Sequence, residues 1–358
     1  MKIHVIRPEE LSPQQIQCWS GMMSPKDVTD GPFFHPDYVI ALGRFREPVR
    51  VAVITEHGRE VAFFPFEQNG KTGHPLGIKL CDFQGIIRAP ETKLDIRGLL
   101  AGCGLTSWHF DHVVASQPEF QGWHLRVEDS VYIDLARGFD AYITEQKRAG
   151  IGSVSQTYRL RRKLEREVGP LRFVWHSTDR AVFETLLEWK SEQRKQTGTF
   201  NVMQFEWVTQ ALDAIRQIGS EDFGGVLSAL YVNDTLIAAA LCMRTKTVLH
   251  KWFSTYQVDL RKYSPGHLLS LAMIEEAATR GIERIDLGRG EEVYKRIWSS
   301  GSIPVGEGAV DLNAIRHLSR TGWYRACHTI RNSRLREPIQ IPKRMIRYFV
   351  RKKKMGQT

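Results

Sequence analysis

Cysteine is scarce in this chain of 358 residues and is never clustered. The cysteines are an odd number and form no Cys-x-x-Cys pair: Cys18, Cys81, Cys103, Cys242 and Cys327. Disulfide frameworks and zinc sites need paired or grouped cysteines, so this pattern argues against both and is typical of a reducing compartment. We therefore expect a cytoplasmic protein that binds no metal.

The chain also has no long apolar run. Its start, MKIHVIRPEE, contains no apolar segment of signal-peptide length, and the most apolar stretch, Leu236 to Met243, is far too short to span a bilayer. With 42% hydrophobic and 25% charged residues, the composition is that of a globular protein. A chain of this length has room for two domains, each with its own core.

Acidic residues are scarce at one end only. From Arg316 onward there are thirteen Lys and Arg residues but one acid, Glu337, so this segment carries +12 and the rest −2 of the total net charge of +10. Apolar residues from Leu312 onward recur at helical spacing: Leu312, Ile315, Leu318, Trp323, Cys327, Ile330, Ile341, Met345 and Phe349. We predict a basic amphipathic arm at residues 312–358.

Two interpretations of this arm remain open. A basic amphipathic helix with aromatic residues can lie on an anionic membrane, which would hold the protein at the inner membrane face. Alternatively, the helix packs on the body and ends in a disordered cationic segment. The same charge can bind RNA or DNA phosphates, but no helix-turn-helix, zinc-finger or RNA-recognition signature supports nucleic acid as the main partner.

The first half of the chain reads as a strand, a helix and an antiparallel meander. MKIHVIRP alternates like an edge strand. The strands VRVAVIT and EVAFFPFE are joined at the turn signal His57-Gly58, a second turn signal follows at Asn69-Gly70, and Pro65 marks a strand end or a bulge. Asp82 has apolar neighbours, so it is either a structural hydrogen-bond anchor or part of a ligand cleft.

The second half alternates helices with strands. A basic helix, TYRLRRKLEREVGP, whose arginines face either solvent or an anionic ligand, precedes the strand LRFVWHS and two amphipathic helices. A hairpin turns at Asn233-Asp234, and the strand VLHKWFSTY follows it. Alternation places His250, Trp252, Ser254 and Tyr256 on one face of that strand, toward an acceptor cleft. The order of elements predicts an α/β (α+β) fold with a mixed, mostly antiparallel twisted sheet flanked by helices.

The stretch from Tyr263 to Trp298 gathers polar groups around a helix start and a strand end. Ser264 can cap a helix, Pro265 suits its first position, and Gly266 permits close approach to the backbone, so this start offers N–H groups to an anion. Charged residues and a tyrosine then crowd the strand end: Asp286, Arg289, Glu291, Glu292, Tyr294, Lys295 and Arg296. The interpretations are a solvated loop and a functional site.

Several pieces of the chain, taken in order, resemble a known family. LIAAALCM, HKWFSTY, YSPGHLLS and IDLGRGEEVYKRIW are similar to the acyltransferase domain of the CelD-like branch of the GNAT superfamily, to which FemAB-type aminoacyl transferases are related. FFHPDYV, EVAFFPFE, CDFQG and YRLRRKLEREVG resemble that family's N-terminal half and bridging helix. The resemblance covers roughly residues 1–310 and implies tandem GNAT-like domains, a degenerate one at 1–136 and an acyltransferase domain at 137–311.

The resemblance also implies a donor site for acetyl-CoA or another acyl-CoA. Ala239 and Leu241 would line the pantetheine arm. The diphosphate would bind at the next helix start, through residues that offer N–H groups and positive charge: Arg261, Lys262, Ser264, Gly266 and His267. The family's usual loop, Gln/Arg-x-x-Gly-x-Gly/Ala, is incomplete in KYSPGH, so a carrier-protein thioester or an aminoacyl-tRNA remains open as donor.

Acyl transfer to an amine needs a general base and a general acid. Tyr294 lies where GNAT enzymes often have an acid tyrosine, and Asp286 and Glu292 are the nearest candidate bases. Lys295 resembles the lysine with which FemAB enzymes hold an anionic acceptor or polarise a carbonyl. We assign acceptor binding to a further set, on grounds of charge, strand alternation and apolar surroundings: Arg289, His250, Tyr256 and Asp82. A local salt bridge between Asp286 and Arg289 is the structural alternative.

Three functional hypotheses follow. The first is an N- or O-acyltransferase that uses acetyl-CoA and a sugar or glycolipid acceptor in cell-envelope or exopolysaccharide biosynthesis. The second is FemAB-like aminoacyl transfer, in which the bridging arginines and the basic arm hold tRNA. The third is a non-catalytic binding module whose donor site is degenerate.

Overall fold

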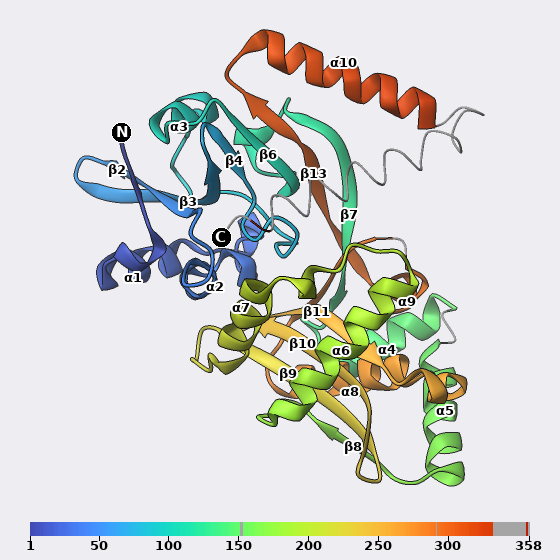
Figure 1. Cartoon of the computed structure of the whole chain (residues 1–358). Helices are drawn as coiled ribbons and strands as arrows, with labels where there is room; N and C mark the ends of the chain where they lie inside the picture. Colours follow the sequence, from blue (N-terminus) through green and yellow to red (C-terminus); the bar gives the residue numbers. More distant parts are fainter. Residues whose placement is uncertain (151–152, 291, 332–355, 357–358) are drawn as a thin grey trace.

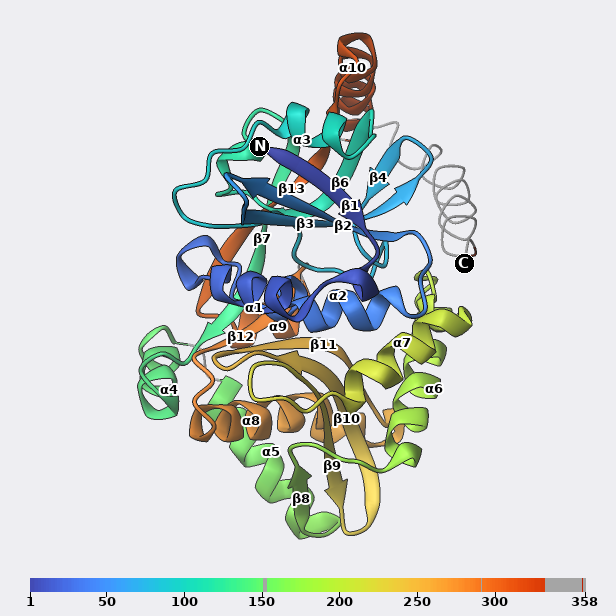
Figure 2. The same ribbon diagram turned by 90° about the vertical axis from the view of Figure 1, so that its left-hand side faces the viewer.

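One mixed sheet runs through the whole molecule (Figures 1 and 2). The computed structural model describes residues 1–150, 153–290, 292–331 and 356. Within these residues the sheet has 13 strands, in the order β1-β2-β3-β4-β6-β13-β7-β12-β11-β10-β9-β8, with β5 paired to β3 beside this path. The predicted fold class, a mixed sheet flanked by helices, is confirmed.

The strands are β1 (Lys2–Ile6), β2 (Val49–Glu56), β3 (Arg59–Asn69), β4 (Thr72–His74), β5 (Ile87–Arg88), β6 (Ser107–Val114), β7 (His124–Asp134), β8 (Leu171–Val174), β9 (Gly224–Val232), β10 (Thr235–Arg244), β11 (Val248–Tyr256), β12 (Arg284–Arg289) and β13 (Gly301–Asp311). The α-helices are α1 (Pro13–Met22), α2 (Pro36–Gly43), α3 (Ile96–Gly102), α4 (Phe139–Arg148), α5 (Ser153–Glu167), α6 (Arg180–Gln196), α7 (Glu206–Gln217), α8 (Pro265–Thr279), α9 (Val293–Trp298) and α10 (Ala314–Arg331). Short 3₁₀ turns connect several of them, including η6 (Val258–Tyr263) before α8.

The turn chemistry of the first half places its strands as predicted. His57 and Gly58 both have positive φ, 51° and 78°, and join β2 to β3 in an antiparallel hairpin. β1 lies at the edge of the sheet. Pro65, however, neither ends β3 nor forms a bulge. It lies between the stretch of β3 that pairs with β5 and the stretch that pairs with β4, so its missing N–H interrupts neither ladder.

The second half has the predicted order of β8, two helices, β9, β10, β11, α8 and β12. Helices cover both faces of this part of the sheet. Along β10, Ala239 and Leu241 pack into the core that contains α6 and α7, whereas Ala238 and Ala240 pack into the core that contains α8. The continuous apolar run of β10 is thus explained by burial on both faces.

Two elements after β12 were not predicted. The charged stretch expected to be a loop contains the short helix α9, and β13 follows it. β13 lies between β6 and β7 and pairs with both. Its sequence, with a proline and three glycines, has little strand character of its own. This segment is therefore a strand because it can pair along both edges, and only the tertiary fold supplies its two neighbouring strands.

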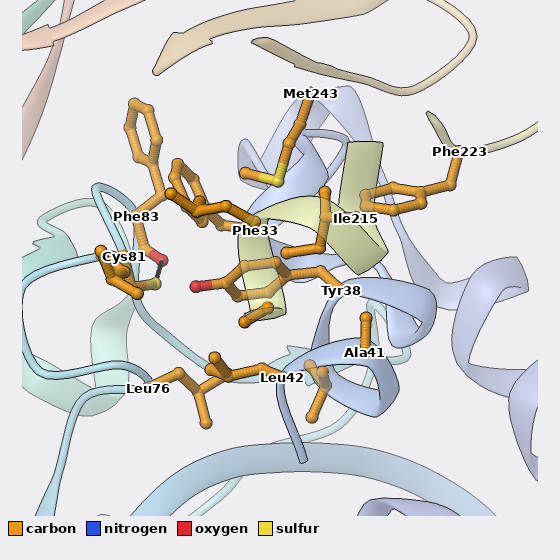
Figure 3. Close-up of a cluster of buried hydrophobic side chains, with 14 of the residues drawn as sticks. Phe33, Tyr38, Ala41, Leu42, Leu76, Cys81, Phe83, Ile215, Phe223 and Met243 are labelled. Atoms are coloured by element: carbon orange, nitrogen blue, oxygen red, sulfur yellow. Dashed lines mark hydrogen bonds between the residues drawn. The ribbon is translucent and has the colours of Figure 1, made fainter. Parts of the chain in front are cut away.

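The two halves share one hydrophobic core. Figure 3 shows Phe33, Tyr38 and Leu42 of the first half beside Ile215 of α7 and Met243 of β10. A buried ion pair lies in this region, because Arg46 contacts Glu67 through two hydrogen bonds of 3.1 and 3.0 Å and stacks 4.8 Å above the ring of Trp207. The domain boundaries after residues 136 and 311, and the degenerate origin of the first half, remain predictions.

The C-terminal arm begins with the predicted helix, α10. The later part of the predicted pattern, Ile341, Met345 and Phe349, lies outside the described residues. Of the helices in the described ranges, none combines the length and the apolar composition needed to cross a bilayer.

Candidate active site

A cavity of about 740 Å³ opens where α6, β11, α8 and α9 meet. Its walls carry seven of the residues proposed from sequence: Tyr256, Arg261, Ser264, Gly266, His267, Glu292 and Tyr294. They also carry cationic side chains that the sequence did not suggest, Lys190 and Arg194 from α6 and Lys251 from β11. The cavity therefore brings the predicted anion-binding helix start together with Glu292 and Tyr294, the predicted base and acid.

The cavity lies along an edge of β11 that its neighbouring strand leaves open. β11 pairs in parallel with β12 only at Val248, Leu249 and His250. Beyond His250 the pairing continues only on the β10 side, as far as Tyr256. Backbone groups of β11 on the other side are thus exposed to the cavity, and Lys190 Nζ already donates to Ser254 O at 3.1 Å.

A bulge in β11 decides which side chains face the cavity. Leu241 of β10 pairs with Phe253, but the next residue, Cys242, pairs with Lys251, so Trp252 is an extra residue. The predicted grouping of His250, Trp252, Ser254 and Tyr256 on one face of the strand is therefore wrong. Ser254 and Tyr256 line the cavity together with Lys251, whereas His250 and Trp252 contact the ring of Phe33 on the opposite side of the sheet.

Lys251 is a buried amine at the inner wall of the cavity. Its Nζ donates to Ser270 Oγ at 2.8 Å, and the Ser270 hydroxyl donates onward to Gly266 O at 2.8 Å. Nζ also lies 5.4 Å from the ring centre of Tyr294. Burial, reinforced by the positive charge of Lys295, lowers the pKa of Lys251 to about 8. A fraction of this amine is therefore neutral and able to accept a proton near neutral pH.

The opposite wall of the cavity is also cationic. Burial and the neighbouring charges of Arg194 and Lys251 lower the pKa of Lys190 to about 8. Burial also lowers the pKa of Arg194. Several cations that destabilise one another in one cavity indicate a site for an anionic ligand.

α9 places Tyr294 in the cavity wall, whereas Lys295 of the same helix is buried outside the cavity. Burial, with the nearby carboxylates of Glu292 and Asp82, raises the pKa of Tyr294 well above its usual range, so its hydroxyl stays protonated. Lys295 does not line the cavity. It donates to Arg289 O at 2.7 Å and pairs with the half-exposed Glu292 at 3.2 Å, and thus holds the segment between β12 and α9.

The start of α8 offers fewer amide donors than predicted. Pro265 has no N–H, and the N–H groups of His267 and Leu268 donate to Ser264 O, which leaves Gly266 as the backbone donor of this turn. Ser264 has a left-handed φ of 53° and does not cap the helix through its side chain. Arg261 lines the cavity, whereas Lys262 Nζ lies 4.7 Å above the Tyr263 ring.

His267 contributes a side-chain donor instead. Trp298 Nε1 donates to His267 Nδ1 at 3.0 Å, and burial together with the charge of Lys251 lowers the pKa of His267. The neutral ring therefore carries its proton on Nε2. That N–H can donate to a carbonyl or phosphate oxygen of a ligand in the cavity.

Besides Lys262 and Lys295, four proposed residues of β10 and β12 lie away from the cavity: Ala239, Leu241, Asp286 and Arg289. Ala239 and Leu241 are fully buried, and β10 pairs with β9 and β11 along both edges, so their backbone cannot bind a donor arm. Asp286 is buried against Arg284, with 3.0 Å between Asp286 Oδ1 and Arg284 Nε. The predicted pair of Asp286 with Arg289 is not formed, because Arg284 binds the Asp286 carboxylate. Arg289 instead pairs with Glu128 at 3.2 Å.

Asp82 and His250 form a separate pair below the cavity. His250 Nε2 donates to Asp82 Oδ2 at 3.1 Å, and the carboxylate retains 32% of its exposure. Burial opposes ionisation of Asp82, but His250 and the positive charge of Lys295 outweigh it and lower the pKa of the carboxyl group. Gly288, with φ of 77°, lets β12 pass close to this carboxylate. Asp82 is thus hydrogen-bonded, as an anchor would be, and also accessible, as a ligand-binding group would be.

Sequence reasoning missed Lys190, Arg194 and Lys251. The two α6 residues stand in an ordinary amphipathic pattern, and alternation placed Lys251 on the wrong face. An unpaired lysine among the apolar residues of HKWFSTY was the only signal in the sequence.

Comparison with known proteins identifies the fold of this part of the chain. Residues 153–296 match the family model of the acetyltransferase (GNAT) domain. This segment therefore has the GNAT acyltransferase fold, as the resemblance implied, while the CelD-like branch remains a prediction. A comparison with curated proteins gave no match.

Solved structures with low sequence identity share the fold of almost the whole chain. FemX aligns with a TM-score of 0.56 at 10% identity, over 89% of this chain and 99% of its own. The C-terminal domain of a protein assigned as a lysylphosphatidylglycerol synthetase, from Agrobacterium fabrum, aligns with a TM-score of 0.51 at 13% identity, over 90% and 98%. L-PGS from Bacillus licheniformis gives 0.51 at 12% identity, over 87% and 96%.

Proposed function

We propose that this chain is an acyltransferase that binds an acyl-coenzyme A, with acetyl-CoA as the first candidate, in the cavity between α6, β11, α8 and α9. One observation carries the proposal: the open edge of β11 beyond His250 runs beside a group of buried and half-buried cations. The GNAT fold of residues 153–296 is consistent with it.

The two features match the two parts of such a donor. A pantetheine arm carries amide groups, which can pair with an unpaired strand edge as an added strand does. The diphosphate would gain charge-assisted hydrogen bonds from Lys190, Arg194 and Arg261, in addition to the single amide of Gly266. The donor strand is thus β11 in this proposal, in place of β10.

The side chains around the cavity suggest how the reaction proceeds. The bound thioester supplies the acyl carbonyl. Lys251, in its neutral form, accepts the proton of the attacking amine or hydroxyl group, and that proton finally reaches the leaving thiolate when the carbon–sulfur bond breaks. His267 Nε2–H is placed to stabilise negative charge on the carbonyl oxygen, and the protonated Tyr294 hydroxyl to stabilise the thiolate.

The acceptor would enter from the side of Asp82. The ionised carboxylate of Asp82 influences Tyr294 electrostatically and comes from the first half of the chain, so an acceptor there would contact both halves. An amine or hydroxyl group of a sugar or glycolipid can hydrogen-bond to this carboxylate. Cell-envelope or exopolysaccharide biosynthesis is the setting that the CelD-like resemblance suggests.

Donor binding provides the first test. We expect isothermal titration calorimetry to detect acetyl-CoA binding, and Lys190→Ala with Arg194→Ala to weaken it by about tenfold or more, since each charge-assisted hydrogen bond contributes about 1.5–3 kcal/mol. Lys195→Ala, next to Arg194 but outside the cavity, is the matched control. No binding to the wild-type protein at high micromolar concentration would exclude acetyl-CoA as the donor.

Tyr294 provides the second test. Tyr294→Phe should lower kcat by about 10- to 100-fold with KM almost unchanged, because the hydroxyl acts on charge that develops during the reaction. Steady-state kinetics with acetyl-CoA and an amine acceptor measure both constants. Wild-type turnover in the variant would refute a role for this hydroxyl.

Aminoacyl transfer is the second candidate. The start of α8 has lost amide donors that a diphosphate would use, and α5 presents a hollow of about 380 Å³ lined by Arg159, Arg162, Lys163 and Arg166, which suits nucleic-acid phosphates. Calorimetry with aminoacyl-tRNA distinguishes the two donors. A non-catalytic binding module would bind a donor but show no transfer with any acceptor.

A further inference from the structure

The first helix of the C-terminal arm packs on the body through its polar side. Arg320 contacts Asp311 with hydrogen bonds of 2.9 and 3.2 Å, and Asp311 is completely buried. One turn earlier, His317 lies edge-on to the ring of Trp123, with 5.0 Å between ring centres. The inward stripe of α10 is therefore made of polar and aromatic side chains.

Over residues 314–324 the apolar side of α10 faces outward. Ile315 is 76% exposed, Leu318 69% and Trp323 70%. These residues follow helical spacing and share one side of the helix, with Arg316 beside them. A surface helix normally packs its apolar side on the body. This part of α10 instead packs its polar side there and exposes its apolar side.

We propose that this outward face of α10 docks on an anionic membrane surface. Ile315, Leu318 and Trp323 would enter the boundary between headgroups and acyl chains, and the tryptophan indole suits that depth. Arg316, beside them on the helix, would meet anionic headgroups. The sequence of α10 contains no acidic residue that would repel them.

The charge of the arm favours a membrane over the two other occupants. From Arg316 onward the sequence has thirteen basic residues and one acid. Two copies of the chain that met through α10 would bring two such segments together, and the chain's own last residues would add further positive charge to a basic helix. An anionic lipid surface is the occupant with complementary charge.

The position of α10 is suited to this role. In both Figure 1 and Figure 2 it lies at one extreme end of the molecule, beyond β13, whereas α5 and α8 lie at the other end. A membrane bound there leaves the cavity between α6 and α8 free. The docking face is thus independent of the proposed donor site.

Flotation with vesicles tests the proposal on the full-length chain. We expect binding to phosphatidylcholine vesicles that contain phosphatidylglycerol, and at least about tenfold weaker binding after Ile315→Ser, Leu318→Ser and Trp323→Ser are combined, because burial of these side chains is lost. Val258→Ser, which changes another exposed apolar residue, 58% accessible and outside α10, should bind like the wild type. Thermal unfolding checks that the triple variant remains folded.

Trp323 fluorescence gives a second measurement without loss of the apolar face. Lipids with brominated acyl chains should quench a component of the wild-type emission that is absent in Trp323→Tyr. Equal vesicle binding by the triple variant and the wild type would overturn the proposal, and so would a wild-type dimer that the triple substitution converts to monomers without any binding to vesicles.

Discussion

Lys251→Met is expected to lower acyl transfer by about 10²- to 10⁴-fold, the usual contribution of a general base. The change removes the buried amine that donates to Ser270 and faces Tyr294, while its length and apolar volume are kept. Donor binding, measured by calorimetry, should change much less, because the cations of α6 and Arg261 remain. The same variant should be as stable as the wild type or more so, since a desolvated charge is removed.

A matched substitution separates proton transfer from simple charge. Lys251→Arg keeps a positive charge at the cavity wall but cannot become neutral, so it should be as inactive as Lys251→Met. The base needs the neutral amine, and the pKa of Lys251 is about 8. The wild-type kcat/KM should therefore rise with pH through about 8 and then level off, and residual activity in the variants should lack that step. An active Lys251→Arg would exclude the proton-transfer role.

Arg46→Met is expected to destabilise the protein by about 3–5 kcal/mol, because it removes one partner of a buried ion pair. Arg46 and Glu67 are each 2% exposed, and Gly77 N donates to the same carboxylate at 2.7 Å. The guanidinium also stacks on Trp207 of α7 and so links the two halves. Urea unfolding, followed by circular dichroism, measures the loss in free energy of unfolding.

The double variant provides the control for this prediction. Arg46→Met with Glu67→Gln removes both charges and keeps an oxygen that can accept from Gly77 N. It should recover most of the stability lost in the single variant. A double variant no more stable than Arg46→Met would show that packing on Trp207, and not the broken ion pair, explains the loss.

The donor site illustrates a limit of sequence alternation. Strict alternation grouped His250 with Ser254 and Tyr256, but the extra residue at Trp252 reverses the faces and brings Lys251 to the cavity. Nothing local in HKWFSTY indicates a bulge. Its position depends on how β10 and β11 pair over their whole length.

The charged residues show the same limit. Asp286 and Arg289 are close in sequence, but Arg284 takes Asp286, and Glu128 from β7 takes Arg289. Glu292 and Tyr294 reached the cavity as predicted because α9 begins directly after β12. Lys295 lies on the buried side of α9, and its hydrogen bond to Arg289 O holds the segment that leads to Glu292 and Tyr294.

By itself the sequence determined the order of helices and strands from β8 to β12, the hairpin turns, the start of α8 and the location of positive charge in the last part of the chain. These features depend on local spacing, on glycine and asparagine at positive φ, and on net charge. Only the tertiary structure decided the place of β13 between β6 and β7, the open edge of β11, the orientation of Lys251 and the outward apolar face of α10. Each of these depends on partners distant in sequence, because strand pairing and helix packing select one face among those that the local pattern allows.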